Sequence, residues 1–422
     1  MHTVRRRAGR VVRLVHTVER PCTFPAMCTG ASPSARGDRR RYRGRVTASP
    51  LADPSRAFGA PVACRFCGGT VGDVVLDLGD QPSSELFPKA EDPGPDPLLP
   101  LRMWLCAVCG LAQLVGADDV AEEPLGFEPA ALAAQRASAL EQLAADGALP
   151  ERGTVAEYPS PHGGTWLPEL GERGLRPAGP EQPADIVVDA CFGLMHFTDQ
   201  RTALAERAAR LAPGGTLLLQ YHCLGAIVDG LQWNALRHGH YAYYSTPAMI
   251  GMLAEVGLTA TTAHRFPLYG GTVLLAATRN GTPGPTVAAV ADAEGAVRDP
   301  AAVSALQGSV ARTADWLRAT CEAERAAGRR VYGYCAASRA VALLRVAGLD
   351  ADLLTAVADA SPDKHGRRMP GADIPIIDPD ALVAARPDVV LLFVSDLAAE
   401  VRAALPQIEA TGGRWVDAGA GR

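Results

Sequence analysis

The chain has 422 residues, of which 48% are hydrophobic and 21% charged, and its formal net charge is -5. This length corresponds to two or three domains, and the composition excludes a chain that is disordered throughout. No apolar run reaches the roughly 18 residues of a membrane-spanning helix, so we expect a cytoplasmic protein with no membrane partner. Ten cysteines in so long a chain exclude a disulfide-dense secreted scaffold.

Residues 1–55 are rich in Arg, Ser and Pro and lack periodicity, and we expect a disordered arm there. A nucleic-acid-binding arm and a targeting peptide are the alternatives, but Arg10, Arg13 and Arg20 interrupt every apolar stretch that a secretory signal needs. A further alternative is that translation starts at Met27 and that the residues before it come from an upstream continuation of the reading frame. Because the rest of the chain is acidic, we expect no nucleic-acid partner.

Two CxxC pairs define a predicted zinc module over residues 56–120. Cys64 and Cys67 form the first pair, Cys106 and Cys109 form the second, and a glycine follows each pair directly. Four thiolates are the ligand set of a structural zinc ion, and a closed set of four leaves no position for chemistry. A redox dithiol and disulfides are the alternatives; a dithiol needs one pair only. Between the pairs we expect a short strand over VVLDLG and a loop that ends at Leu101.

Residues 121–280 alternate between helical and strand-like patterns, which indicates a mainly parallel α/β sheet. An Ala-rich helix is expected over 129–148, with Gly147 as its stop. A second helix starts at residue 201 and is expected to end in a Pro-Gly-Gly turn. The predicted strands are 154–158, 184–190, 216–221 and 272–278.

A second alternating block, over 286–422, follows the linker NGTPGPT. It begins with a long Ala-rich helix through Arg329. Strands are then expected at 329–334, 354–359, 388–394 and 414–418, and helices at 338–348 and 397–405. The sequence therefore predicts an α/β protein: an N-terminal four-cysteine zinc module followed by two Rossmann-like α/β domains.

Several motifs stand in the order found in one enzyme family. Besides the cysteine pairs and LDLGDQPSSELFP between them, they are FGLMHFTD (192–199), QWNALRHGHYAYYS (232–245), YGGT (269–272), YGYCAASRA (332–340) and SPDKHGRRMPGADIPI (361–376). The chain resembles the C-methyltransferases that act on nucleotide-linked 4-keto-deoxysugars in antibiotic biosynthesis. The resemblance extends from about Val62 to the end of the sequence.

The resemblance implies that a base removes the proton at sugar C3 and that the enolate then attacks the methyl group of S-adenosylmethionine. His240 matches the base of the family and His196 its second histidine. The family loop reads Tyr-His-Glu-His, whereas here it reads Arg-His-Gly-His, so that Arg237 stands where the family has Tyr. A guanidinium can stabilise an enolate oxygen as a hydroxyl does. The alternative is that His240 is a packed loop residue among aromatic neighbours.

The resemblance also implies a cofactor loop after the first strand of the central domain. Glu157, Ser160 and Gly163 align with the acidic residue, serine and glycine of the family motif EIGSNDG, although prolines replace other positions. The acid that should follow the second strand, and about one βαβ unit, are missing from the sequence. Glu181 is the only nearby acidic candidate.

The C-terminal block carries a predicted substrate site. The strand-loop-helix at YGYCAASRA is a natural anion site, and the basic loop of 361–376 follows it. By resemblance, the side chains and backbone that would bind the nucleotide-sugar are those of Gly333, Ser338, Lys364, His365 and Arg367. The alternative is a solvated basic turn.

The resulting prediction is a methyltransferase that acts at C3 of a nucleotide-linked 4-keto-deoxysugar, with zinc and S-adenosylmethionine as cofactors. Two other functions stay open. One is an NADPH-dependent 4-ketoreductase of the same class of sugar, although the sequence contains no intact GxGxxG. The other is a non-catalytic sugar-binding subunit. The sequence does not indicate an oligomeric state.

Overall fold

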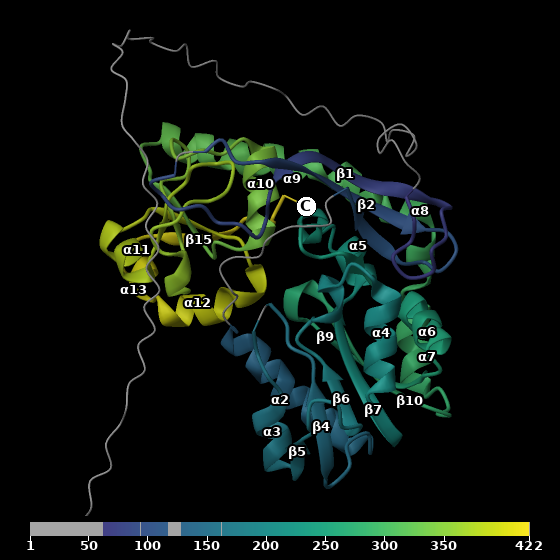
Figure 1. The fold of residues 1–422 in the computed structure, drawn as a ribbon. Helices are drawn as coiled ribbons and strands as arrows, with labels where there is room; N and C mark the ends of the chain where they lie inside the picture. Colours follow the sequence, from purple (N-terminus) through teal and green to yellow (C-terminus); the bar gives the residue numbers. More distant parts are fainter. Residues whose placement is uncertain (1–61, 93, 117–127, 162, 422) are drawn as a thin grey trace, which may run out of the picture. The chain divides into compact units, whose positions relative to one another are not determined.

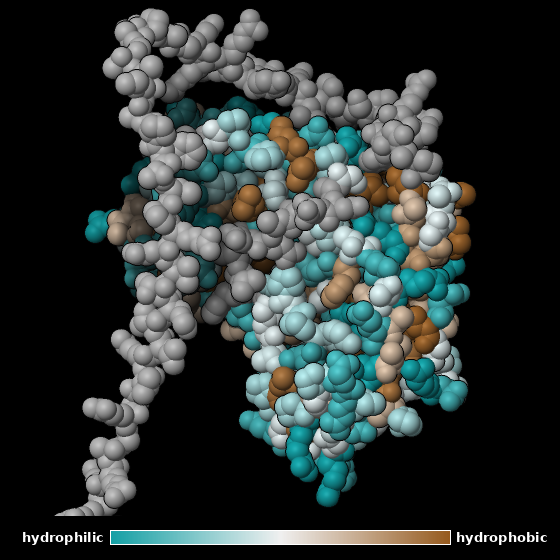
Figure 2. Space-filling view, viewed as in Figure 1, coloured by the Kyte–Doolittle hydropathy of each residue, from teal (hydrophilic) through white to brown (hydrophobic). Residues whose placement is uncertain are grey.

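The structure is a computed structural model that describes residues 62–92, 94–116, 128–161 and 163–421. The arm predicted over 1–55 lies outside these residues. The described residues belong to one compact unit, which contains three β-sheets (Figure 1). Within these residues, no helix is both long and apolar enough to span a membrane. Figure 2 shows hydrophobic residues dispersed among hydrophilic ones on the face that is viewed.

The first sheet is antiparallel and belongs mostly to the cysteine-containing segment. Its order is β1-β2-β3-β8, and the strands are β1 (Gly72–Pro82), β2 (Leu98–Cys106), β3 (Ala112–Val115) and β8 (Ala242–Tyr243). The sequence prediction of a loop ending at Leu101 is wrong, because β2 already begins at Leu98 and pairs with β1. Strand β8 comes from a distant part of the chain.

The central sheet has six strands in the order β5-β4-β6-β7-β10-β9. Strands β4 to β7 are parallel, and β10 is antiparallel to both of its neighbours. The strands are β4 (Gly153–Glu157), β5 (Leu175–Pro177), β6 (Ala184–Asp189), β7 (Leu211–His222), β9 (Thr259–Phe266) and β10 (Thr272–Thr278).

Helices cover both faces of this sheet, since successive strand residues point to opposite sides. Leu218 packs with residues of α2 and α3, whereas Leu217 and Leu219 pack with residues of α4, α6 and α7 on the other face. The helices of this region are α2 (Ala130–Ala145), α3 (Leu167–Glu172), α4 (Gln200–Ala209), α5 (Leu224–Asp229), α6 (Thr246–Glu255) and α7 (Pro285–Ala293).

Two predictions about this domain are corrected and one is confirmed. The Pro-Gly-Gly segment is not a turn after a helix, because α4 ends at Ala209 and β7 runs from Leu211 through the glycines. The second strand is present as the three-residue β5, and six residues, 178–183, lead from it directly into β6. The helix stop predicted at Gly147 is confirmed. α2 ends at Ala145, and Gly147, just after its C-cap, has a left-handed φ of 71°.

The C-terminal sheet is entirely parallel, with the order β13-β12-β11-β14-β15. This is the 3-2-1-4-5 strand order of a Rossmann fold. Its strands are β11 (Val331–Tyr334), β12 (Val357–Ala358), β13 (Ile376–Ile377), β14 (Val389–Leu392) and β15 (Arg414–Asp417).

The long helix predicted before β11 is divided into shorter segments. Its last and longest part is α9, and Pro300 begins the preceding α8. The helices are α8 (Pro300–Val303), α9 (Ala305–Ala326), α10 (Ser338–Ala347), α11 (Pro379–Ala385), α12 (Ala398–Ala404) and α13 (Gln407–Ala410). The 3-10 turns are η1 (Leu194–His196), η2 (Trp233–Ala235), η3 (Leu268–Gly270), η4 (Gly295–Arg298), η5 (Pro362–Lys364) and η6 (Ser395–Leu397). The predicted fold class, a four-cysteine module with two Rossmann-like α/β domains, is confirmed.

Candidate functional site

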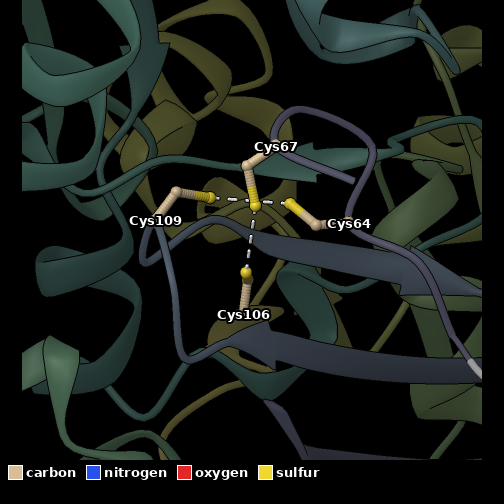
Figure 3. Close-up of side chains that lie close together, drawn as sticks. All are labelled: Cys64, Cys67, Cys106 and Cys109. Atoms are coloured by element: carbon tan, nitrogen blue, oxygen red, sulfur yellow. Dashed lines mark hydrogen bonds between the residues drawn. The ribbon is translucent and has the colours of Figure 1, made fainter. Parts of the chain in front are cut away.

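The four cysteines of the CxxC pairs meet at one point beside the first sheet (Figure 3). Their Sγ atoms all lie within 4.8 Å of one another. The Sγ atoms of Cys64 and Cys109 are 3.5 Å apart, and those of Cys67 and Cys106 are 3.6 Å apart. Zinc bonds of about 2.3 Å in a tetrahedron require sulfur separations close to these values. The four side chains therefore fit one zinc ion.

Each cysteine pair ends in the glycine turn that the sequence indicates. Gly68 and Gly110 have φ of 71° and 79°, and each backbone N–H donates to the carbonyl of the first cysteine of its pair at 3.0 Å. An L-residue with a side chain is strained in this left-handed conformation. The glycines thus bring both cysteines of each pair to the same side.

The sheet of the cysteine module also holds the loop that carries His240. Strand β8 follows this loop directly and pairs with β3, with Ala112 opposite Tyr243. Next to the pair, the N–H of Leu114 donates to the carbonyl of Tyr241 at 3.2 Å, and the N–H of Tyr241 donates to that of Met195 at 2.7 Å. The module therefore fixes the backbone on the C-terminal side of His240.

Three predicted site residues come together: Arg237 and His240 of this loop, and His196 at the end of η1. The rings of His196 and His240 meet edge to face, with their centroids 4.8 Å apart. The Nε of Arg237 donates to Nε2 of His240 at 3.0 Å, and its Nη1 donates to Oγ of Ser338 at 2.9 Å. Since Nε2 accepts from a cation, His240 has an unprotonated nitrogen in this arrangement. An unprotonated imidazole is the state that a general base requires.

A cavity of about 260 Å³ has in its lining residues at or just after the carboxyl ends of strands in both the central and the C-terminal sheet. Its lining includes His222, Arg237 and His240 from the central part, and Ser338 and Lys364 from the C-terminal part. In open parallel sheets, ligands bind outside the carboxyl ends of the strands, where the strand order reverses. In the C-terminal sheet that point lies between β11 and β14, and Cys335 and Val394 from there also line the cavity.

The predicted substrate residues divide into two groups. Ser338 and Lys364 line the cavity, and Nζ of Lys364 donates to the carbonyl of Ala336 at 2.8 Å. Three others lie outside the lining: Gly333, His365 and Arg367. A Cβ on Gly333 would lie 2.6 Å from the Phe393 ring, Nε2 of His365 bonds the carbonyl of Asp359 at 2.8 Å, and Arg367 donates to two backbone carbonyls.

The charged groups of the cavity are balanced, and several are engaged with each other. Nζ of Lys364 lies 3.5 Å from Oδ2 of Asp359, and Nε of Arg237 lies 3.8 Å from Oε1 of Glu85. The carboxylate of Glu400, on α12, accepts the backbone N–H groups of Ala130 and Ala131 at the start of α2. The helix has no side-chain cap of its own, so Glu400 joins it to the C-terminal domain.

The predicted cofactor residues Glu157, Ser160 and Gly163 do not line this cavity. The carboxylate of Glu157, at the end of β4, accepts from the hydroxyl of Thr165 and from the N–H of Trp166. Gly163 has a φ of 72°, and its N–H donates to the carbonyl of Ser160 at 3.0 Å. All three residues thus make contacts within the loop itself.

The loops after β4 and β6 pack against each other at this end of the sheet. A Cβ on Gly193 would lie 2.8 Å from the carbonyl of Pro159 and 2.9 Å from Oδ1 of Asp189. Asp189 ends β6 and forms a fully buried ion pair with Arg207. The cavity is lined near this end of the sheet by the apolar Phe192 and Met195, which follow β6. Glu181 lies exposed between β5 and β6.

The cavity residues that the sequence analysis did not name as site residues include His222 and Tyr269. His222 is the last residue of β7, one position beyond the predicted strand end. A polar residue at the end of an apolar strand was the available signal. Tyr269 has a φ of 56° in the YGGT turn, and its ring meets Phe192 at 6.0 Å between centroids. Burial raises the pKa of the Tyr269 hydroxyl to about 12.

Comparison with known proteins identifies two segments of the chain. Residues 267–418 match the family model described as "C-methyltransferase C-terminal domain", and residues 64–119 match the one described as "Putative zinc binding domain". The chain is 25% identical over 238 residues to the C-methyltransferase NovU of Streptomyces niveus, which covers 54% of each protein. The chain therefore spans about half the length of this curated relative.

Solved structures are only distantly similar. The N-methyltransferase NodS of Bradyrhizobium japonicum is 16% identical, with 37% of this chain and all of that chain covered, at a TM-score of 0.25. The magnesium protoporphyrin IX methyltransferase of Synechocystis is 13% identical, with 35% and 83% covered, at a TM-score of 0.25. The two family-model matches, over residues 64–119 and 267–418, are the more informative comparison.

Proposed function

We propose that this protein is an S-adenosylmethionine-dependent C-methyltransferase that acts at C3 of a nucleotide-linked 4-keto-deoxysugar. The observation that carries the proposal is the single cavity lined by Arg237 and His240 on one side and by Ser338 and Lys364 on the other. A ligand that spans it can present a ketone to the first pair and phosphate groups to the second. The similarity to NovU, a C-methyltransferase, supports the reaction class.

His240 is the proposed general base for the sugar carbon next to the ketone. In the absence of ligand, Arg237 donates to its Nε2. When the ketone oxygen enters, it competes for the same guanidinium, and this releases the nitrogen lone pair. The base then takes the proton, the C–H electron pair forms the enolate double bond, and the negative charge develops on the oxygen beside Arg237.

The start of α10 is the proposed binding site of the diphosphate. The loop after β11 and the first turn of the ten-residue α10 form the strand-to-helix junction at which Rossmann folds bind phosphate. Ser338 offers a hydroxyl there, and the ammonium of Lys364 lies beside the carbonyl of Ala336 in the same loop. These groups hold the nucleotide end while the sugar reaches His240.

S-adenosylmethionine, when bound, supplies an electrophilic methyl group to the enolate carbon. Phe192 and Met195, which follow β6, are the side chains proposed to contact it. Both are buried and apolar, so they exclude water from the reacting carbon. The zinc ion has no role in this chemistry; it stabilises the sheet that positions the loop of His240.

The test is transfer of labelled methyl from S-adenosylmethionine to a nucleoside-diphosphate 4-keto-deoxysugar by the purified full-length protein. We expect label in the sugar with wild-type protein and a large loss with His240→Gln, while His264→Gln, on β9, retains full transfer. Absence of transfer together with reduction of the ketone by NADPH would instead identify a ketoreductase. Sugar binding without either reaction would identify a non-catalytic subunit.

A further inference from the structure

His222 is the one cavity residue in the described part of the chain whose buried imidazole nitrogen has no hydrogen-bond partner. The residue ends β7 and is 8% exposed, and its backbone is held opposite Thr272 of β10. Its Nε2 atom is buried and has no partner. The side chain lines the cavity together with Arg237 and Arg339. A buried polar atom without a partner is costly, which points to a ligand that completes it.

The surroundings of His222 keep its imidazole uncharged. Burial, and then the positive charges of Arg339 and Arg237, lower its pKa to about 3, and a hydrogen bond to the backbone of Tyr269 opposes them. A neutral imidazole carries one N–H and one lone pair, so with the N–H on Nδ1 the unpartnered Nε2 is a hydrogen-bond acceptor.

The lone pair of Nε2 cannot form a hydrogen bond with a phosphate oxygen, because both atoms are acceptors. The matching ligand group is therefore a hydrogen-bond donor. Hydroxyl groups are the donors of a sugar. A nitrogen held neutral so strongly is also a weak base, so it is unsuited to remove a proton from carbon. Three carboxylates of the cavity lie beside donors: Asp359 beside Lys364, Glu400 at the start of α2, and Glu85 in an ion pair with Arg237. At the end of β7, Nε2 of His222 is the acceptor that faces the cavity.

We propose that Nε2 of His222 accepts a hydrogen bond from a sugar hydroxyl of the bound nucleotide-sugar, and that this bond discriminates between hydroxylated and deoxygenated sugars. The inference rests on the proposed substrate class. Ribose hydroxyls of S-adenosylmethionine carry the same chemistry, so the experiment titrates the two ligands separately. A site that bonds a hydroxyl rejects a ligand without it, because the acceptor is then buried and unpaired.

The experiment measures affinities by calorimetry with full-length zinc-loaded protein. The probes are a nucleoside-diphosphate 4-keto-6-deoxyhexose, its 2-deoxy and 3-deoxy counterparts, and S-adenosylmethionine. The variants are His222→Leu, which removes the acceptor at similar volume, and His222→Gln, which offers an amide oxygen. His264→Gln is the control. His264 lies on β9, forms an ion pair with Asp146, and does not line the cavity. The unfolding temperature and zinc content verify each fold.

We expect wild-type protein to bind one of the two deoxy ligands about tenfold more weakly than the parent, as expected for one lost hydrogen bond. His222→Leu should bind parent and deoxy ligand equally, and His222→Gln should recover part of the difference. Equal discrimination in wild type and His222→Leu would overturn the proposal, as would a selective loss of S-adenosylmethionine affinity. If His222→Leu does not fold, the same comparison is made with His222→Gln. None of these readings depends on methyl transfer, so failure of the proposed reaction remains distinguishable.

Discussion

Arg237 donates to Oγ of Ser338 at 2.9 Å, and this bond joins the loop of His240 to the first residue of α10. The same guanidinium donates to His240 through Nε. One side chain thus contacts the proposed base and the proposed diphosphate site. The backbone N–H of Arg237 also donates to the hydroxyl of Tyr243 at 3.0 Å. Tyr243 belongs to β8, the strand that pairs with β3 of the cysteine module.

Replacement of Arg237 should lower catalysis more than substrate binding. Arg237→Gln removes the cation beside the ketone oxygen, and we expect the rate of methyl transfer to fall by about 100-fold, the usual loss for one oxyanion donor. Arg237→Tyr restores the hydroxyl that the family loop has at this position and should retain more activity than Arg237→Gln. Steady-state kinetics of both variants, measured with kcat and KM separated, check this. An increase in KM alone would assign Arg237 to binding only.

Removal of the zinc ion should lower activity although no ligand cysteine lines the cavity. Without the ion the two cysteine turns separate, β3 loses its support, and the β3–β8 pairing beside His240 weakens. We expect Cys106→Ala to lower both the unfolding temperature and methyl transfer. Cys321→Ala is the matched control, since Cys321 is equally buried but lies in α9. Full activity of Cys106→Ala at normal stability would refute this role of the module.

His222 should make the protein sensitive to mild acid. Its folded pKa is about 3, below the ordinary value of 6.5, so between these values the unfolded chain binds a proton that the folded protein excludes. Stability is therefore complete above pH 6.5 and decreases toward pH 3, by about 1 kcal/mol for each pH unit. His222→Gln should reduce this loss between pH 6.5 and 4.5. Denaturant unfolding at pH 6.5 and at pH 4.5 measures the loss of stability. An equal loss in wild type and His222→Gln would contradict the burial of a neutral imidazole.

Glu157 provides a test of whether the loop after β4 binds cofactor. Its carboxylate is bonded to Thr165 and Trp166, and burial raises its pKa. We expect Glu157→Gln to lower the unfolding temperature, because the amide can accept only one of the two hydrogen bonds. Affinity for S-adenosylmethionine, measured by calorimetry, should change less than twofold. A tenfold loss of affinity at unchanged stability would place the cofactor at Glu157.

Local patterns were sufficient to predict much of the fold and the metal centre. The CxxC spacing with its glycines predicted the thiol cluster, and strand β10 was predicted with the bounds that it has. The pairing of β8 with β3 could not be predicted, since it joins residues about 130 positions apart with only two residues of strand. The predicted strand ended at Tyr221 and so left out His222, which is the last residue of β7.

The most direct test of the central claim is exchange of the sugar proton next to the ketone, followed by NMR in heavy water without S-adenosylmethionine. If the cavity binds a nucleotide-linked 4-keto-deoxysugar and His240 removes that proton beside Arg237, wild-type protein should exchange it for deuterium, whereas His240→Gln should not. His264→Gln should exchange it like the wild type. Binding of the sugar without exchange, or equal exchange by His240→Gln, would contradict the account.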